Sequence, residues 1–298
     1  MNPKHIILTL LLMLCPIGMA AQSTITRNKP KPAVTKPKPA AKPKAKPKPA
    51  PRRNSTHHSS NSSSTTSLSA ELNKLINNMV YVSGGTFTMG GTSEQGSDAY
   101  DDEKPTHSVT LSSYYICKYE VTQALWRAVM GNNPSNFKGD NLPVECVSWD
   151  DCQTFINRLN SYTGRNFRLP TEAEWEFAAR GGNYSRHYKY SGSNYISDVA
   201  WYDGNSSNRT HPVGTKQANE LGLYDMSGNV WEWCSDWYGS YSSYSQNDPT
   251  GPNSGSGRVN RGGGWSSIAR GCRSSIRGGN APGYRIYDLG VRLVLSQL

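Results

Sequence analysis

Hydrophobic and polar positions divide the 298-residue chain into a short apolar stretch, a long polar stretch and a mixed remainder. The apolar run 6–14 follows Lys4 and His5 and precedes the small residues 18–21, which is typical of a secretory signal peptide over 1–21. We therefore expect an exported protein that is periplasmic, cell-envelope-associated or extracellular. The run is shorter than the roughly 20 residues that span a bilayer, so no transmembrane helix is expected after cleavage.

Residues 22–70 form the polar stretch, with repeated Lys-Pro units followed by a Ser/Thr/Asn run. Large apolar side chains are almost absent, so the segment cannot offset the entropy lost on ordering. Proline alternating with lysines that repel one another favours an extended spacer. We expect a disordered linker here and a folded domain over 71–298.

The mixed remainder begins with short alternating segments and continues with helical ones. Four strands are predicted at 80–82, 86–89, 108–111 and 114–117, and a final strand at 290–295. Three helices are predicted from their caps: one starts at Thr122 and stops at Gly131, one starts at Ser148, and one starts at Thr171 and runs to Arg180. The second helix carries Cys152, Phe155, Ile156 and Leu159 on one face. After Arg180 the chain is rich in Gly, Asn, Ser and Tyr, which indicates long loops and an α+β fold with few helices and short irregular strands.

Charge is distributed very unevenly. The chain has 32 basic and 22 acidic residues, and no acidic residue precedes Glu71, whereas twelve basic ones do. The predicted domain therefore has 32 − 12 = 20 basic against 22 acidic residues, a net charge of −2. A nucleic-acid surface on the domain is unsupported. The basic segment either binds an anionic envelope polymer or is a solvated spacer without a binding partner.

The stretch 222–238 (GLYDMSGNVWEWCSDWY) is the strongest candidate for a metal site. It places Asp225 and Glu232 around a tight turn at Ser227-Gly228-Asn229. Two carboxylates with free carbonyls between them suit calcium, which takes six to eight oxygen ligands. The alternative is that Glu232 caps a turn and the tryptophans are core. The spacing is not that of an EF-hand loop, and the histidines show no zinc spacing.

Five cysteines follow the predicted signal peptide. An odd number leaves at least one thiol outside any disulfide, and we expect Cys272, in the loop after RGGGW, to be free and exposed. The other four form two disulfides in one of three pairings, or are small core residues: Cys117, Cys146, Cys152 and Cys234.

Aromatic residues are frequent in the predicted loops. They either line a surface for a protein, peptide or glycan ligand or pack internally: Tyr184, Tyr188, Tyr190, Trp201, Tyr202, Trp237, Tyr238, Tyr241 and Tyr244. Core packing is expected for the tryptophans, and a loop surface for the tyrosines at 238–244.

Seven motifs occur in an order that resembles one known family. They are MVYVSGGTFTMG at Met79, YEVTQALW at Tyr119, PVECVSWDDC at Pro143, FRLPTEAEWEFAARGG at Phe167, GLYDMSGNVWEW at Gly222, RGGGW at Arg261 and GVRL at Gly290. Together they resemble the formylglycine-generating (sulfatase-modifying factor) family and cover nearly all of 79–298. The resemblance implies a variant of the C-type-lectin-like fold stabilised by calcium. It also implies that the Asp225 and Glu232 side chains and the Gly228 and Val230 carbonyls bind calcium.

The same resemblance bears on catalysis. Family enzymes oxidise a sulfatase cysteine to formylglycine with oxygen, using two cysteines five positions apart that hold Cu(I). Here the second position is Cys272, the first is Ser267, and Gly264 replaces a usual serine. A serine hydroxyl is a hard ligand and holds Cu(I) poorly.

The incomplete pair of cysteines favours a binding or envelope-structural role on a calcium-stabilised scaffold. The alternative is an active oxidase that uses Cys272, with copper(I) bound only if Cys272 finds another ligand. Two positions that carry a structural disulfide in some members are Ala179 and Leu293 here.

Overall fold

The computed structural model describes residues 60–296. The predicted signal peptide (1–21) and the basic part of the predicted linker lie outside the described residues. Export, which residues 1–21 imply, stays a prediction.

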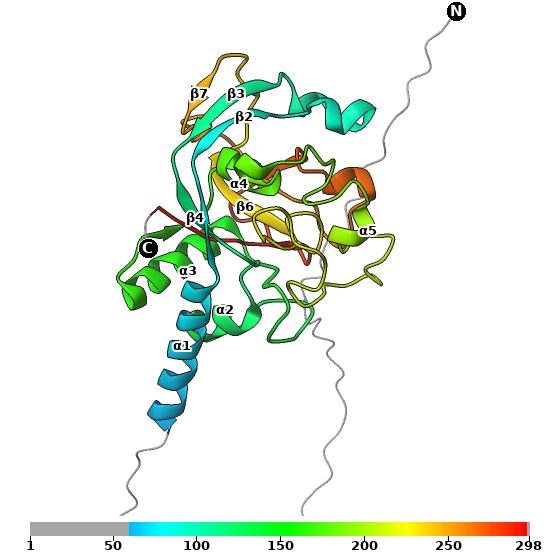
Figure 1. Cartoon of the computed structure of the whole chain (residues 1–298). Helices are drawn as coiled ribbons and strands as arrows, with labels where there is room; N and C mark the ends of the chain where they lie inside the picture. The colour runs from blue at the N-terminus through cyan, green and yellow to red at the C-terminus, as the bar shows by residue number, and fades with distance from the viewer. Residues whose placement is uncertain (1–59, 297–298) are drawn as a thin grey trace, which may run out of the picture. The chain divides into compact units, whose positions relative to one another are not determined.

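Short elements joined by long loops make up the described part of the chain (Figure 1). The helices are α1 (Ser60–Asn77), α2 (Gln123–Met130), α3 (Trp149–Thr163), α4 (Glu172–Ala179) and α5 (Ile196–Val199), with 3-10 turns η1 (Ser93–Asp98), η2 (Asp101–Glu103), η3 (Gly182–Tyr184) and η4 (Ala269–Cys272). The strands are β1 (Met79–Val82), β2 (Gly85–Met89), β3 (His107–Leu111), β4 (Tyr114–Cys117), β5 (Phe167–Arg168), β6 (Trp231–Trp237), β7 (Gln246–Asn247), β8 (Arg258–Arg261), β9 (Arg277–Asn280), β10 (Leu289–Gly290) and β11 (Val294–Leu295).

The strands form three small sheets, whose orders are β1-β4-β11-β5, β10-β6-β8-β9 and β2-β3-β7. Most pairs are antiparallel, and β10–β6 and β3–β7 are parallel. In Figure 1, α1, α2 and α3 lie at one end of the domain, the sheet of β2, β3 and β7 lies at the other, and α4 and β6 lie between them. The α+β class with few helices and short strands is confirmed.

The predicted helix ends are confirmed, because each depends on a local hydrogen bond. The Thr122 hydroxyl accepts from the backbone N–H of Leu125, and Gly131 ends α2 with φ 81°. Ser148 and Thr171 each open a helix with a reciprocal capping box. The four strands predicted before α2 are also present, within one residue of the predicted bounds.

Two boundaries differ from the prediction. Helix α1 begins at Ser60, so the last part of the predicted linker, 60–70, is helical. The reason is that Leu68, Leu72 and Ile76 recur at helical spacing and pack against the core, which extends the helix into the polar run. The predicted strand 290–295 is two short strands, because the chain leaves β6 after Gly290 and joins β4 and β5 at Val294.

Two apolar clusters hold the domain together. One joins α1, α2 and α3 with Trp233 and Leu293, and the other joins β2, β3, β4 and α4 with Trp175. Cys152 and Cys234 are core residues, as one of the two alternatives predicted. Cys117 is buried as well, and none of these three forms a disulfide with another cysteine of residues 60–296. Ala179 and Leu293 are fully buried, so apolar packing occupies these two positions.

Candidate functional site

The turn before β6 is buried and needs its glycine. Asp225 and Asn229 adopt left-handed φ angles of 58° and 61°, and Gly228 has φ 83°. A Cβ on Gly228 would lie 2.3 Å from the carbonyl oxygen of Trp201, so a larger residue cannot occupy this position. The Gly228 N–H donates to the Gly262 carbonyl at 2.9 Å, which ties the turn to the RGGGW segment.

The two predicted carboxylate ligands have different partners. One oxygen of Asp225 accepts the Gly214 N–H at 2.7 Å, and its other oxygen, Oδ1, is buried without a hydrogen-bond partner among the described residues. Glu232 is fully buried and forms an ion pair with Arg292, 2.7 Å between Nη2 and Oε1. The Trp175 indole N–H donates to Glu232 Oε2 at 2.6 Å. Glu232 is thus held rigidly, and Asp225 keeps one free oxygen.

A third carboxylate, Glu120, lies at the same turn and was not identified from the sequence. It accepts the Val230 N–H at 3.1 Å and the Asn229 side-chain amide at 2.7 Å. Burial, with Asp225 and Glu232 nearby, raises the pKa of Glu120 well above its usual range. Burial also raises the pKa of Asp225 to about 6. The only sequence signal for Glu120 is its place in the YEVT motif.

The side chains at this turn supply oxygen ligands for a calcium ion, but too few of them to hold the ion by themselves. Among the described residues, three buried carboxylates face the buried guanidinium of Arg292 and Asp225 Oδ1 has no hydrogen-bond partner, so the turn has an excess of oxygen ligands and negative charge. Within residues 60–296, however, no three His, Cys, Asp or Glu side chains are placed to hold a metal together. A calcium ion here would therefore need backbone carbonyls, as in the set predicted with Gly228 and Val230.

Cys272 is buried, so the prediction that it is exposed is wrong. Its side chain packs in a small apolar cluster with Tyr190 and Val199. The cause is Gly263: a Cβ there would lie 2.9 Å from the Cys272 sulfur, so the glycine lets the thiol pack against the backbone. Burial raises the pKa of the thiol well above its usual range. Because the thiolate is the nucleophile and the metal ligand, this environment opposes both roles.

Ser267, at the position of the missing cysteine, stabilises a turn. Its hydroxyl accepts the Gly264 N–H at 3.0 Å, and its own N–H donates to the Gly264 carbonyl at 2.9 Å. Its carbonyl accepts from Asp203 at 3.0 Å. The hydroxyl is therefore used within the loop. A buried thiol, whose burial disfavours the thiolate, and a hydrogen-bonded serine do not fit a Cu(I) site that needs two thiolates.

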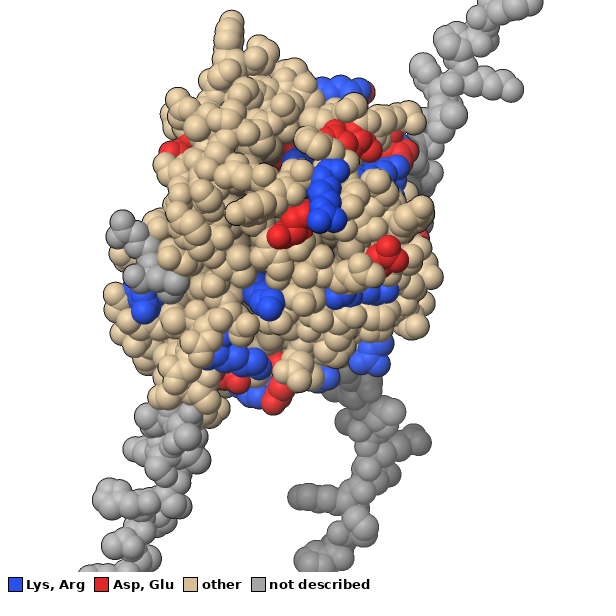
Figure 2. Space-filling model, in the orientation of Figure 1, with Lys and Arg blue, Asp and Glu red and all other residues tan. Residues whose placement is uncertain are grey.

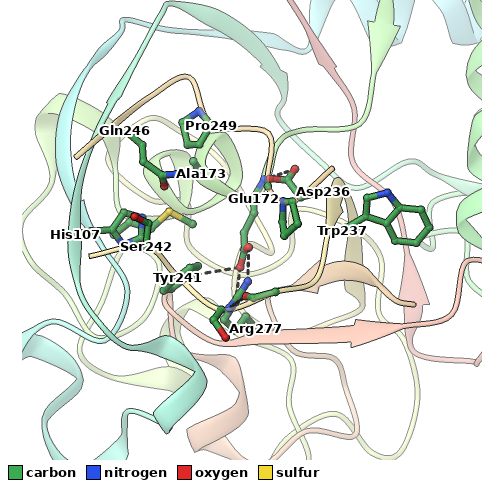
Figure 3. A pocket seen from close by; sticks show the side chains of 15 residues that line it. His107, Glu172, Ala173, Asp236, Trp237, Tyr241, Ser242, Gln246, Pro249 and Arg277 are labelled. Carbon is green, nitrogen blue, oxygen red and sulfur yellow. Dashed lines mark hydrogen bonds and ion pairs between the residues drawn. The ribbon is translucent and has the colours of Figure 1, made fainter. Parts of the chain in front are cut away.

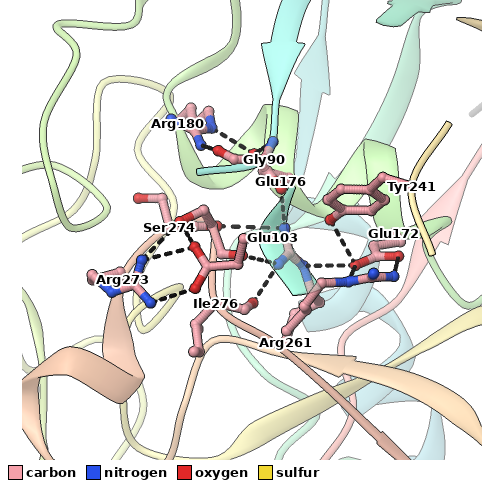
Figure 4. A network of polar contacts seen from close by, with 12 residues as sticks. Gly90, Glu103, Glu172, Glu176, Arg180, Tyr241, Arg261, Arg273, Ser274 and Ile276 are labelled. Carbon is pink, nitrogen blue, oxygen red and sulfur yellow. Dashed lines mark hydrogen bonds and ion pairs between the residues drawn. The ribbon is translucent and has the colours of Figure 1, made fainter. Parts of the chain in front are cut away.

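Buried arginines form a network that crosses the domain and that sequence reasoning missed (Figure 4). Arg261 is fully buried, pairs with Glu176 and donates to the backbone carbonyls of Ser275, at 2.7 Å, and Ile276. Glu176 also pairs with Arg180 at 2.8 Å. Further pairs join Arg273 to Glu103 and Arg277 to Glu172. These contacts connect α4 with β8 and β9.

The predicted aromatic residues do not form one exposed face. Tyr184 and Tyr244 are 69% and 80% exposed. Several of the others have internal partners: Tyr190 is buried, Trp201 stacks on His211, Trp237 contacts the Arg258 guanidinium, Tyr238 bonds Asp102 and Tyr241 bonds Glu172.

Two aromatic rings meet the Trp265 ring, close to Ser267 in the chain, and the exposed Ile268 directly follows Ser267. We call these four residues the Trp265 edge: Phe137, Trp265, Ile268 and Tyr287. Trp265 meets Phe137 edge-on at 5.6 Å and Tyr287 at 5.4 Å between ring centroids. Ile268 is 58% exposed and Tyr287 41%. Phe137, Trp265 and Tyr287 come from distant parts of the chain, and nothing in the local sequence around each one indicates that their rings meet.

Acidic and basic side chains are scattered on the face shown in Figure 2, with no large area of one sign. Among the described helices, none is both long enough and apolar enough to cross a membrane.

Residues 65–297 match the sulfatase-modifying factor enzyme 1-like domain, so the chain belongs to this family. Among solved structures, it is similar to Treponema denticola variable protein 1, with a TM-score of 0.68, 36% identity, and coverage of 74% of this chain and 95% of that one. The resemblance inferred from the seven motifs is confirmed.

Two curated relatives have different names. One is "Chaperone protein LppX" of Paenibacillus barcinonensis, 37% identical over 271 residues, covering 74% of this chain and 90% of the relative. The other is the formylglycine-generating enzyme of Streptomyces coelicolor, 31% identical over 284 residues, covering 72% of this chain and 87% of the relative. The family therefore contains proteins named as enzymes and proteins named otherwise.

Proposed function

We propose that this chain uses the formylglycine-generating scaffold as a binding domain and lacks the copper oxidase chemistry. The observation that carries the proposal is the state of the two key positions. Cys272 is a buried thiol, and the Ser267 hydroxyl is hydrogen-bonded to Gly264. Two thiolates suit Cu(I), whereas here one position is a hydroxyl and the other is a thiol whose burial raises its pKa and disfavours the thiolate.

The ligand is a polypeptide bound at the Trp265 edge. Exposed apolar side chains on an aromatic base are the usual centre of a protein interface. The name of the LppX relative, a chaperone, supports a polypeptide over the glycan that the sequence also allowed. Because residues 1–21 predict export, we propose that this binding takes place outside the cytoplasm. Calcium at the 225–232 turn is part of the proposal and has a structural role.

A titration with a permanently unfolded polypeptide, such as a reduced and carboxymethylated protein, tests the binding. We expect saturable binding that is lost when Ile268→Asp and Tyr287→Ala are combined. Tyr244→Ala is the matched control, because Tyr244 is more exposed than either and does not belong to the Trp265 edge. No binding by the wild-type chain, or equal loss with Tyr244→Ala, would refute a polypeptide ligand at this edge.

The alternative is an active oxidase that uses Cys272, and family membership favours it. It is tested with a peptide that carries a sulfatase-type cysteine motif, supplied with oxygen and Cu(I). We expect no aldehyde and no oxygen consumption above a Cys272→Ser variant. Oxidation of the peptide by the wild-type chain and not by the Cys272→Ser variant would overturn the proposal.

A further inference from the structure

A small cavity lies apart from both sites described above. It has a volume of about 250 Å³ and is bounded by β3, the start of α4, the end of β6, the loop 239–252 and β9 (Figure 3). It shares no lining residue with the 225–232 turn, with Cys272 or with the Trp265 edge. Pockets for drug-sized ligands are about 300–1,000 Å³, so this one suits a smaller chemical group.

Two of the charged residues in its wall neutralise each other. Arg277 donates from Nε and Nη2 to the two oxygens of Glu172, at 2.7 and 2.6 Å. The Tyr241 hydroxyl donates to Glu172 at 3.0 Å, and Arg277 Nη1 donates to the Gly239 carbonyl at 2.8 Å. Figure 3 shows these three side chains turned toward one another. Their hydrogen-bonding capacity is largely used.

Asp236, in the same wall, has no such partner. It is only 4% exposed, and no basic side chain of the described chain forms an ion pair with it. Oδ2 accepts the Glu172 N–H at 3.0 Å and the Ser235 hydroxyl at 2.9 Å, whereas Oδ1 accepts no hydrogen bond among the described residues. A buried carboxylate without a counter-ion is costly, and such groups concentrate at binding sites.

The rest of the lining is suited to an alkylammonium group. Three N–H donors of an ammonium need three acceptors. The lining contains Asp236 and three residues whose side chains carry an acceptor oxygen, Ser240, Ser242 and Gln246, of which the Ser242 hydroxyl also accepts the Tyr244 N–H at 3.1 Å. Met89 and Ala173 supply apolar surface for a methylene chain. We propose that this cavity binds a primary alkylammonium ion, with Asp236 as its counter-ion.

Binding of this kind depends on pH. Burial and the neighbouring Glu172 raise the pKa of Asp236 to about 7. The other charged or titratable groups that line the cavity or interact with Asp236 are His107, Arg168, Glu172, Glu174, Cys234, Tyr241, Arg258 and Arg277. Because the ammonium pairs with the ionised carboxylate, affinity rises as pH increases through this value. We expect binding about tenfold weaker at pH 6 than at pH 8, the ratio of ionised fractions for a single group.

The test is a calorimetric titration of the full chain with n-butylammonium, with n-butanol as the neutral match. A second arm uses Nα-acetyl-lysine amide, with Nα-acetyl-norleucine amide as its match, and shows whether a lysine side chain of a polypeptide enters as well as a free amine. We expect saturable binding of at least one cation and none of either neutral analogue.

Variants separate binding from folding. Asp236→Asn should abolish binding, and so should Ser242→Phe, which fills the cavity and keeps the charge. Glu145→Gln is the control, because Glu145 is also a fully buried carboxylate with a raised pKa and lies outside this cavity. The proposal is overturned if no cation binds, if Asp236→Asn binds as the wild type does, or if a neutral monosaccharide binds and the amines do not. It does not depend on the proposed polypeptide binding.

Discussion

The buried pair of Arg261 and Glu176 allows a stability prediction whose size follows from the structure. We consider Arg261→Met, which keeps a long side chain and removes the guanidinium. Glu176, fully buried, would keep Arg180 and the Gly90 N–H but lose its partner from β8. The carbonyls of Ser275 and Ile276 would also lose a donor.

Removing one partner of a buried ion pair costs about 3–5 kcal/mol, because the other charge stays buried and less compensated. We therefore expect Arg261→Met to lower the free energy of unfolding by about that amount. Arg127→Met is the control: Arg127 pairs with Asp140 on the surface, where both side chains are roughly half exposed or more. A surface pair contributes about 0–1 kcal/mol.

Urea denaturation measures the free energy of unfolding of both variants. The dependence of this free energy on urea concentration is compared with that of the wild type, to exclude a change in the unfolded state. Adding Glu176→Gln to Arg261→Met should cost less than the sum of the two single changes, because the charge that was left unpaired is removed as well. A loss below about 1 kcal/mol for Arg261→Met, or strict additivity of the pair, would show that the network does not carry this energy.

Three further predictions concern other parts of the chain. Calcium chelation should lower the Tm of the wild type and leave the Tm of Asp225→Ala unchanged, because an ion bound only to the native state raises Tm. An unchanged Tm of the wild type would rule out the structural calcium. Thr171→Ala should lower the free energy of unfolding by about 1 kcal/mol, because it removes the cap of α4. Thr154→Ala, on the exposed face of α3, should lower it by less than about 0.5 kcal/mol, and equal losses in the two variants would contradict the cap assignment. In the folded state the pKa of Asp236 is raised from 3.8 to about 7, so the folded state holds this proton more tightly than the unfolded state does. The free energy of unfolding should therefore fall as pH rises from about 4 to 7, and Asp236→Asn should lose this part of the pH dependence. A pH profile that is the same in Asp236→Asn and the wild type would refute the raised pKa.

Local signals account for what the sequence predicted well. A capping hydroxyl, a carboxylate three residues later and a glycine at the end act within one helical turn, so Ser148 and Thr171 could be recognised as helix starts. The seven motifs then supplied the order of elements and the family. The 225–232 turn was found because its polar residues are adjacent in the chain.

Contacts between distant segments account for what was missed. Arg273 and Glu103 are 170 residues apart, and arginine in a sequence is ordinarily expected at the surface. Glu120 joins Val230 across 110 residues. The burial of Cys272 depends on Gly263, whose missing Cβ leaves room for the sulfur, and the sequence alone does not show this approach.

The absence of a copper dithiolate is the central claim, and a Cu(I) competition titration of the full chain tests it most directly. The wild type is compared with Cys272→Ser, and with Ser267→Cys, which restores the second thiol position. We expect no tight binding by the wild type and no difference from Cys272→Ser, because burial disfavours the thiolate of Cys272 and Ser267 is a poor ligand. Tight binding by the wild type that disappears in Cys272→Ser would show that Cys272 is a copper ligand and would favour the oxidase.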